Sequence, residues 1–274
     1  MTFTQKFCVD IAAAPLKSAA LISMIVTPFA MAQSVDVDDG AWHGSVGMAL
    51  MSQPKYPGSN ETRMGPMPTF NFTKGRWQLG ALPGAGVPLG ASYTLQQEGP
   101  WRFGLGVGTS LDKPRTANNG SQQSNLGEIR RSTLGSLTGS YTEGAVTASA
   151  SIIGDIGGNQ QGTRVLLDVM LKSKPMNKWV FSAGPGITVM DRQYAQTYYG
   201  VSSAQSASSG YATYQASAGV NALRIGAGAD YELTRDWRLG AKFNVSKLQG
   251  DAASSPIAEK GSQISYGFFA NYRF

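Results

Sequence analysis

Few side chains in this sequence could support catalysis or bind a metal. His43 is the only histidine and Cys8 is the only cysteine. A nucleophilic serine usually needs a histidine as its base, and no serine with an acidic orienting residue is expected beside His43. Asp36, Asp38 and Asp39 resemble half of a calcium loop, but the sequence lacks the other half. We therefore predict no catalytic residue, no metal site and no cofactor.

The dominant pattern from residue 40 onward is alternation of apolar with small or polar residues. It is clearest at the C-terminus, where every second residue is apolar: Ile264, Tyr266, Phe268, Ala270, Tyr272 and Phe274. A period of two predicts strands with one face in an apolar medium and the other in water. A final strand that ends on aromatic residues is typical of bacterial outer-membrane barrels.

Short connections of a few residues alternate with several long polar ones between these segments. This arrangement predicts an all-β fold: a transmembrane antiparallel up-and-down β-barrel of about 12 strands, with both termini in the periplasm. A soluble lipocalin-like barrel is the structural alternative, but it would hide its aromatic residues inside. Pro185 is expected to weaken or bend its strand. The expected strands cover 42–51, 66–73, 76–82, 88–96, 101–108, 130–141, 145–154, 164–172, 178–190, 223–231, 237–246 and 264–274.

The two faces of these strands carry different residues. All five tryptophans fall at the start of odd-numbered strands, which predicts a girdle at the periplasmic membrane interface: Trp42, Trp77, Trp101, Trp179 and Trp237. The run Gly104-Leu105-Gly106-Val107-Gly108 places glycines on the inward face, and it is no phosphate loop because no helical pattern follows. Charges on that face should pair or line water: Arg76, Arg102, Arg164, Asp168, Lys172, Arg224, Asp230, Arg238 and Lys242. The narrow bore is expected to be partly filled by long side chains or by an inward-folded loop.

The N-terminal segment has the features of a secretory leader. Lys6 and Lys17 precede an apolar run at 19–26, and Ala30-Met31-Ala32 fits the rule for cleavage. The run is too short for a membrane-spanning helix. We therefore expect a signal peptide at 1–32, a barrel at 33–274 and a location in the outer membrane of a Gram-negative cell.

The formal net charge of the chain is +6, but the basic residues are spread along it. A nucleic-acid site would need a basic patch, so no nucleic-acid partner is predicted. The positive balance favours contact with outer-membrane lipid and anionic lipopolysaccharide.

Three polar segments resemble one known family. They follow the first strand or fill long loops before later strands, and their motif residues are Pro54, Tyr56, Gly58, Tyr199, Gly200, Val201, Gly250, Asp251, Ser255 and Pro256. With the terminal Tyr272-Arg273-Phe274, they are similar to the MltA-interacting protein (MipA)/OmpV family of outer-membrane proteins. Family members often have Asp where this chain has Ser254.

The resemblance implies an outer-membrane barrel without catalytic activity. For some members it implies a scaffold that links a lytic transglycosylase to a peptidoglycan synthase. Others are porin-like or adhesive, so a narrow channel for small solutes or a surface adhesin is the alternative. From the residues alone, the loop motifs are interpreted as structural, since Pro and Gly set turns and Asp251 can satisfy loop amides.

Overall fold

The computed structural model describes residues 40–110, 114–115 and 125–274, and the expected leader lies outside them. The described residues form twelve strands and three short helices. Each strand pairs antiparallel with its neighbours along the chain, and β1 pairs with β12 to close the barrel. The predicted 12-stranded antiparallel barrel is confirmed. No helix among the described residues is long and apolar enough to cross a membrane.

The strands begin and end close to their expected positions. They are β1 (His43–Pro54), β2 (Thr62–Lys74), β3 (Trp77–Leu82), β4 (Val87–Gln96), β5 (Trp101–Thr109), β6 (Thr133–Glu143), β7 (Val146–Asp155), β8 (Thr163–Lys172), β9 (Trp179–Met190), β10 (Gly219–Glu232), β11 (Trp237–Leu248) and β12 (Ser262–Arg273). The helices are α1 (Arg192–Tyr199), α2 (Ser203–Ser209) and α3 (Gly250–Ser254).

Two irregularities in the sheet have local causes. β10 begins before its predicted start, and a bulge between Val220 and Ala222 shifts the alternation there. A bulge places two residues opposite one, so the first residues of β10 lose the period of two. The pairing of β8 with β9 is interrupted between Asp168–Gly186 and Leu171–Ala183, opposite Pro185. Proline lacks an N–H, which agrees with the expected weakening of this strand.

The outer wall of the barrel is apolar. In β12, Ile264 and Phe268 are 48% and 61% exposed, whereas Gln263 is 8% exposed. Large apolar side chains alternate with buried small or polar ones in β5 as well. Such a wall suits contact with lipid chains, while a soluble barrel would bury these residues.

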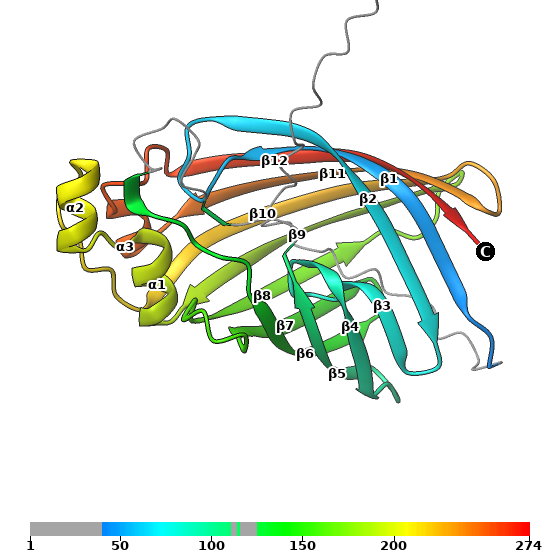
Figure 1. Ribbon diagram of the computed structural model, residues 1–274. Helices are drawn as coiled ribbons and strands as arrows, with labels where there is room; N and C mark the ends of the chain where they lie inside the picture. The colour runs from blue at the N-terminus through cyan, green and yellow to red at the C-terminus, as the bar shows by residue number, and fades with distance from the viewer. Residues whose placement is uncertain (1–39, 111–113, 116–124) are drawn as a thin grey trace, which may run out of the picture.

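The two ends of the barrel differ. Figure 1 shows α1, α2 and α3 gathered at one end, and the C-terminus lies toward the other. The end with the helices is called the loop end here, and the opposite end is called the turn end. At the turn end, Gly44 and Phe274 exchange two backbone hydrogen bonds of 3.0 Å, which join the first and last strands. The chain therefore enters and leaves the barrel on one side.

Candidate functional site

The connection between β3 and β4 folds into the bore. Leu82, Ala85 and Val87 are almost fully buried in a cluster with Ile153 of β7 and Leu166 of β8. These strands lie on the far side of β5 and β6 in the sheet order, so the hairpin must cross the lumen to reach them. The bore was expected to be partly filled by long side chains or by an inward-folded loop, and the β3–β4 hairpin is such a loop.

The inward glycines of β5 make room for the hairpin. A Cβ atom on Gly106 would lie 3.1 Å from Leu82 Cδ2. On Gly108 it would lie 2.8 Å from Val87 Cγ1. A side chain at either position would have to displace the hairpin, so Gly106 and Gly108 form its seat.

The loop end is covered by a packed cap. Helix α1 begins after Asp191, whose carboxylate accepts a hydrogen bond from Tyr194 N at 2.6 Å. Tyr199 is fully buried, and its hydroxyl accepts a 2.8 Å hydrogen bond from Asn221 Nδ2 of β10. Tyr199 packs in one cluster with Leu248 of β11 and Ala252 of α3. The helix is therefore fixed to the barrel wall by an apolar cluster and a buried hydrogen bond.

Burial also shifts the protonation of groups in the cap. The pKa of the Tyr199 phenol is raised well above its usual value by burial. Burial likewise raises the pKa of Tyr198, with a further contribution from Tyr194. The pKa of Arg115, whose guanidinium donates to Tyr198 O at 3.4 Å, is lowered by burial. The un-ionised phenol is thus the form that the cap favours.

The family-like loop motifs lie together in this cap. Ser255 Oγ donates to Tyr199 O at 2.6 Å, and Ser217 N donates to the Asp251 carboxylate at 2.7 Å. Val201 and Ile257 are buried in one cluster. Other motif residues shape the backbone: Gly58 and Gly250 have φ of +93° and +50°, and the Gly200 N–H caps α1 through Gln196 O. Pro54 and Tyr56 lie at the same end of the barrel. Pro54 is the last residue of β1, and the Tyr56 carbonyl accepts a hydrogen bond from Gln263 Nε2.

A chamber of about 110 Å³ lies within the bore, bounded by residues of the β3–β4 hairpin, of α1 and of the barrel wall. A volume of roughly 10–15 Å³ accommodates one water, so the chamber has room for several waters or a small solute. Its polar walls include Gln53, Arg164, Tyr194, Tyr198, Asn221 and Arg224.

Ion pairs follow one side of the inner wall from the chamber to the turn end. Arg224 and Asp168 approach to 2.9 Å, and Lys242 and Asp230 to 3.0 Å. Lys242 Nζ also lies 5.7 Å from the centre of the Phe269 ring. These pairs neutralise much of the charge in this part of the bore, which lowers the cost of removing it from water.

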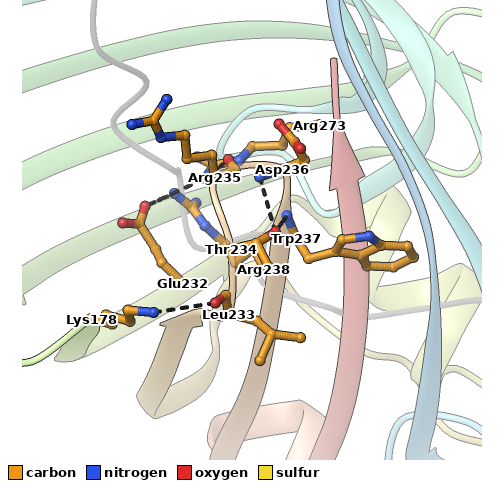
Figure 2. A network of polar contacts seen from close by, with 9 residues as sticks. All are labelled: Lys178, Glu232, Leu233, Thr234, Arg235, Asp236, Trp237, Arg238 and Arg273. Atoms are coloured by element: carbon orange, nitrogen blue, oxygen red, sulfur yellow. Dashed lines mark hydrogen bonds and ion pairs between the residues drawn. The ribbon is translucent and has the colours of Figure 1, made fainter.

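The turn between β10 and β11 carries a network of partly exposed charges (Figure 2). Glu232 contacts Arg238 at 3.4 Å and Arg273 at 3.5 Å. Lys178 Nζ donates to Leu233 O at 3.3 Å, which ties the turn after β8 to the turn after β10. Ion pairs at such an exposed rim contribute little stability.

The tryptophans lie at one end of the strands, and their place at the periplasmic interface stays a prediction. Trp77, Trp101, Trp179 and Trp237 are the first residues of β3, β5, β9 and β11, and Trp42 precedes β1. All five are exposed on the outer surface, from 40% to 54%. Four contact a tyrosine directly opposite in the adjacent strand, with the two rings edge-to-face or tilted; the partners are Tyr93, Tyr141, Tyr231 and Tyr272.

Not every charge expected on the bore wall lies there. Arg76 is exposed in the turn between β2 and β3, where it donates to Leu95 O at 3.1 Å. Lys172 is exposed at the last residue of β8. Both belong to the rim of the turn end, because the strands stop before or at these residues. Arg102 and Arg238 are half-buried on the inward side of β5 and β11.

Some residues of the chamber and cap escaped the sequence analysis. Tyr194 and Tyr198 lie in a segment that was interpreted as a polar loop, and Asn221 lies in β10 just before the expected start of that strand. A local signal for the helices was present: Ser202 and Gln205 are spaced as a capping box, and the structure forms it.

No group of three or more histidine, cysteine, aspartate and glutamate side chains that could hold a metal occurs within the described ranges.

A closed antiparallel barrel with an apolar outer wall, a partly filled bore and a capped mouth defines the class of this protein: a membrane β-barrel, the type that occupies the outer membrane. The chain belongs to the family described as MltA-interacting protein MipA, whose family model matches residues 46–274. This confirms the family that the loop motifs indicated.

No curated protein matches the chain. Among solved structures, the chain is similar to the outer-membrane expressed OmpT of Vibrio cholerae, with 10% identity and a TM-score of 0.38 over 85% of this chain and 97% of that one. The NanC porin gives 9% identity and a TM-score of 0.42 over 85% and 100% of the two chains. The outer membrane channel DcaP of Acinetobacter baumannii gives 12% identity and a TM-score of 0.36 over 85% and 96%.

Proposed function

We propose that this protein is a non-enzymatic scaffold of the outer membrane that remains closed to solutes. In this proposal the leader at 1–32 is removed, and the turn end, with the start of β1, the end of β12 and the tryptophan girdle, faces the periplasm. The observation that supports it best is the β3–β4 hairpin inside the bore, reinforced by the cap over the loop end. A conducting pore needs a continuous hydrated path, and both features obstruct one.

Planar-bilayer recording tests whether the barrel is closed. We expect no steady conductance from the wild-type protein. A matched variant replaces residues 81–89 with Asn-Gly, which joins Gly80 to Gly90 by a two-residue hairpin turn. These glycines pair directly in the native sheet, so the wall should persist while the tip of the hairpin is lost. Conductance in the variant alone supports the proposal, whereas steady, salt-dependent conductance of the wild type supports the narrow channel instead.

The scaffold part of the proposal concerns the turn end. The family description names an interaction with MltA, and the resemblance implies a lytic transglycosylase and a peptidoglycan synthase as partners. A basic patch formed by Lys172, Lys174, Lys178 and Arg235, with exposed Met176 between them, offers a surface on this rim. A firm interface buries about 1,000 Å² or more, so such short turns suit a weak or multi-point contact.

Crosslinking in detergent with a purified lytic transglycosylase tests this surface. Charge reversal by Lys174→Glu with Lys178→Glu is expected to reduce the crosslinked product. The matched control is Arg130→Glu with Arg131→Glu, which reverses two exposed cations just before β6 at the loop end. If both variants crosslink as strongly as the wild type, the basic patch is not the contact surface.

A further inference from the structure

The chamber in the bore has an unbalanced set of charges. Its described lining includes the cations Lys55, Arg164 and Arg224 and no aspartate or glutamate. Lys55 pairs with Glu61 at the loop end, and Arg224 pairs with Asp168. Arg164 is the cation that lacks a carboxylate partner among the described residues.

Within the part of the chain that the structure describes, the side-chain contacts of Arg164 are to neutral groups. Its Nη1 donates to the Tyr194 hydroxyl at 3.3 Å, and its Nη2 donates to Ala85 O at 3.4 Å. The guanidinium carbon lies 5.9 Å from the centre of the Tyr194 ring. These contacts hold the guanidinium between the hairpin and α1 without neutralising its charge.

Among the described residues that line the chamber, the buried side-chain atoms without a hydrogen-bond partner are donors. Gln53 Nε2, Arg164 Nε and Arg224 Nε are buried, and no described protein atom accepts a bond from them. All three residues line the chamber, and Gln53 and Arg224 are only 3% and 5% exposed. Buried donors are normally satisfied, so the chamber calls for an occupant that brings acceptor atoms.

We propose that the chamber binds a small free oxyanion, a carboxylate or a phosphate, with Arg164 as its main ligand. The planar guanidinium matches the oxygen atoms of either group, and a charge-assisted hydrogen bond is strong in a partly dry site. The half-exposed Lys55 and Tyr56 of the loop end also line the chamber, which gives an entrance from that side. This site needs no conducting pore and does not rest on the scaffold proposal.

Calorimetric titration of the full barrel in detergent tests the site. The probes are sodium phosphate and sodium acetate, each compared with sodium chloride at equal ionic strength. We expect saturable binding of at least one oxyanion to the wild type. In Arg164→Gln the affinity should fall roughly tenfold to a hundredfold, since one charged hydrogen-bonding partner is lost. The control Arg76→Gln removes the same charge from an exposed turn and should bind like the wild type.

Two further outcomes keep the test decisive. If Arg164→Gln does not fold, Arg164→Lys retains the charge but loses the planar fork, and weaker binding than wild type is still expected. The proposal is overturned if wild-type protein binds neither oxyanion at about 10 mM, which would leave water as the occupant. It is also overturned if folded Arg164→Gln or Arg164→Lys binds as tightly as wild type.

Discussion

Gly186 of β9 offers the sharpest test of how the inner wall is built. It lies directly between Asp168 of β8 and Arg224 of β10 in the sheet. The ion pair of these two residues therefore spans a strand, and it can do so only across a residue without a side chain. A Cβ atom at position 186 would lie 2.1 Å from Asp168 Oδ1 and 2.9 Å from Arg224 Nη2.

Gly186→Ala should therefore displace the Asp168 carboxylate from Arg224. Overfilling a packed site costs about 1–3 kcal/mol. Leaving one member of a buried ion pair without its partner costs about 3–5 kcal/mol. The Arg224 side chain is 4% exposed, but that of Asp168 is 25% exposed and can turn partly toward water. We therefore expect a loss of about 2–4 kcal/mol in the free energy of unfolding.

Denaturant unfolding of the folded barrel, followed by tryptophan fluorescence, measures this loss. The control is Gly219→Ala, because a Cβ atom there meets nothing within 4 Å. The same substitution in an Asp168→Ala background isolates the clash, and the cost of Gly186→Ala should shrink there by about 1–3 kcal/mol. The reasoning is refuted if Gly186→Ala and Gly219→Ala agree within about 0.5 kcal/mol, or if the cost is unchanged without Asp168.

Two other predictions concern the ends of the barrel. Trp101 and Tyr141 meet edge-to-face with ring centres 4.9 Å apart, so a double-mutant cycle with leucine at each position should give a coupling of about 0.5–1.5 kcal/mol, and zero coupling would contradict this aromatic contact. Burial raises the pKa of Tyr198 and Tyr199 in the folded protein. Their un-ionised phenols therefore contribute fully to the free energy of unfolding below about pH 10, the ordinary pKa of tyrosine. This contribution is lost as the pH rises from there through the raised pKa. Tyrosinate absorbance should therefore appear together with protease cleavage of the cap, and ionisation at the ordinary pKa with an intact cap would contradict this.

The strands could be predicted because alternation is a local property. Each residue of β5 shows in the sequence whether it faces outward or inward, and the register follows from short turns. The same holds for the tryptophans, since each precedes or begins a strand. Arg76 was placed on the wall because strand ends are the least certain part of such a reading, and the structure has a turn there.

The interior could not be predicted in the same way. Contacts such as Leu82 with Gly108, or Arg164 with Ala85 O, join segments that are distant in the sequence. Nothing local distinguishes a hairpin that extends the wall from one that folds into the bore. The inward glycines of β5 indicated that the inner face of this strand leaves space. The sequence alone does not show that apolar residues of the β3–β4 hairpin fill it.

The inward glycines have a shared consequence for function. Where Gly106 and Gly108 leave space, the hairpin fills it, and where Gly186 leaves space, an ion pair crosses the strand. Glycines on the inner face therefore do not widen this bore, because the hairpin and the ion pair occupy the space beside them. Outside the chamber beneath α1, the polar groups that a soluble partner can reach lie at the two ends of the barrel. A partner-binding role should accordingly be sought at the turn end and the cap, and a small-ligand role at Arg164.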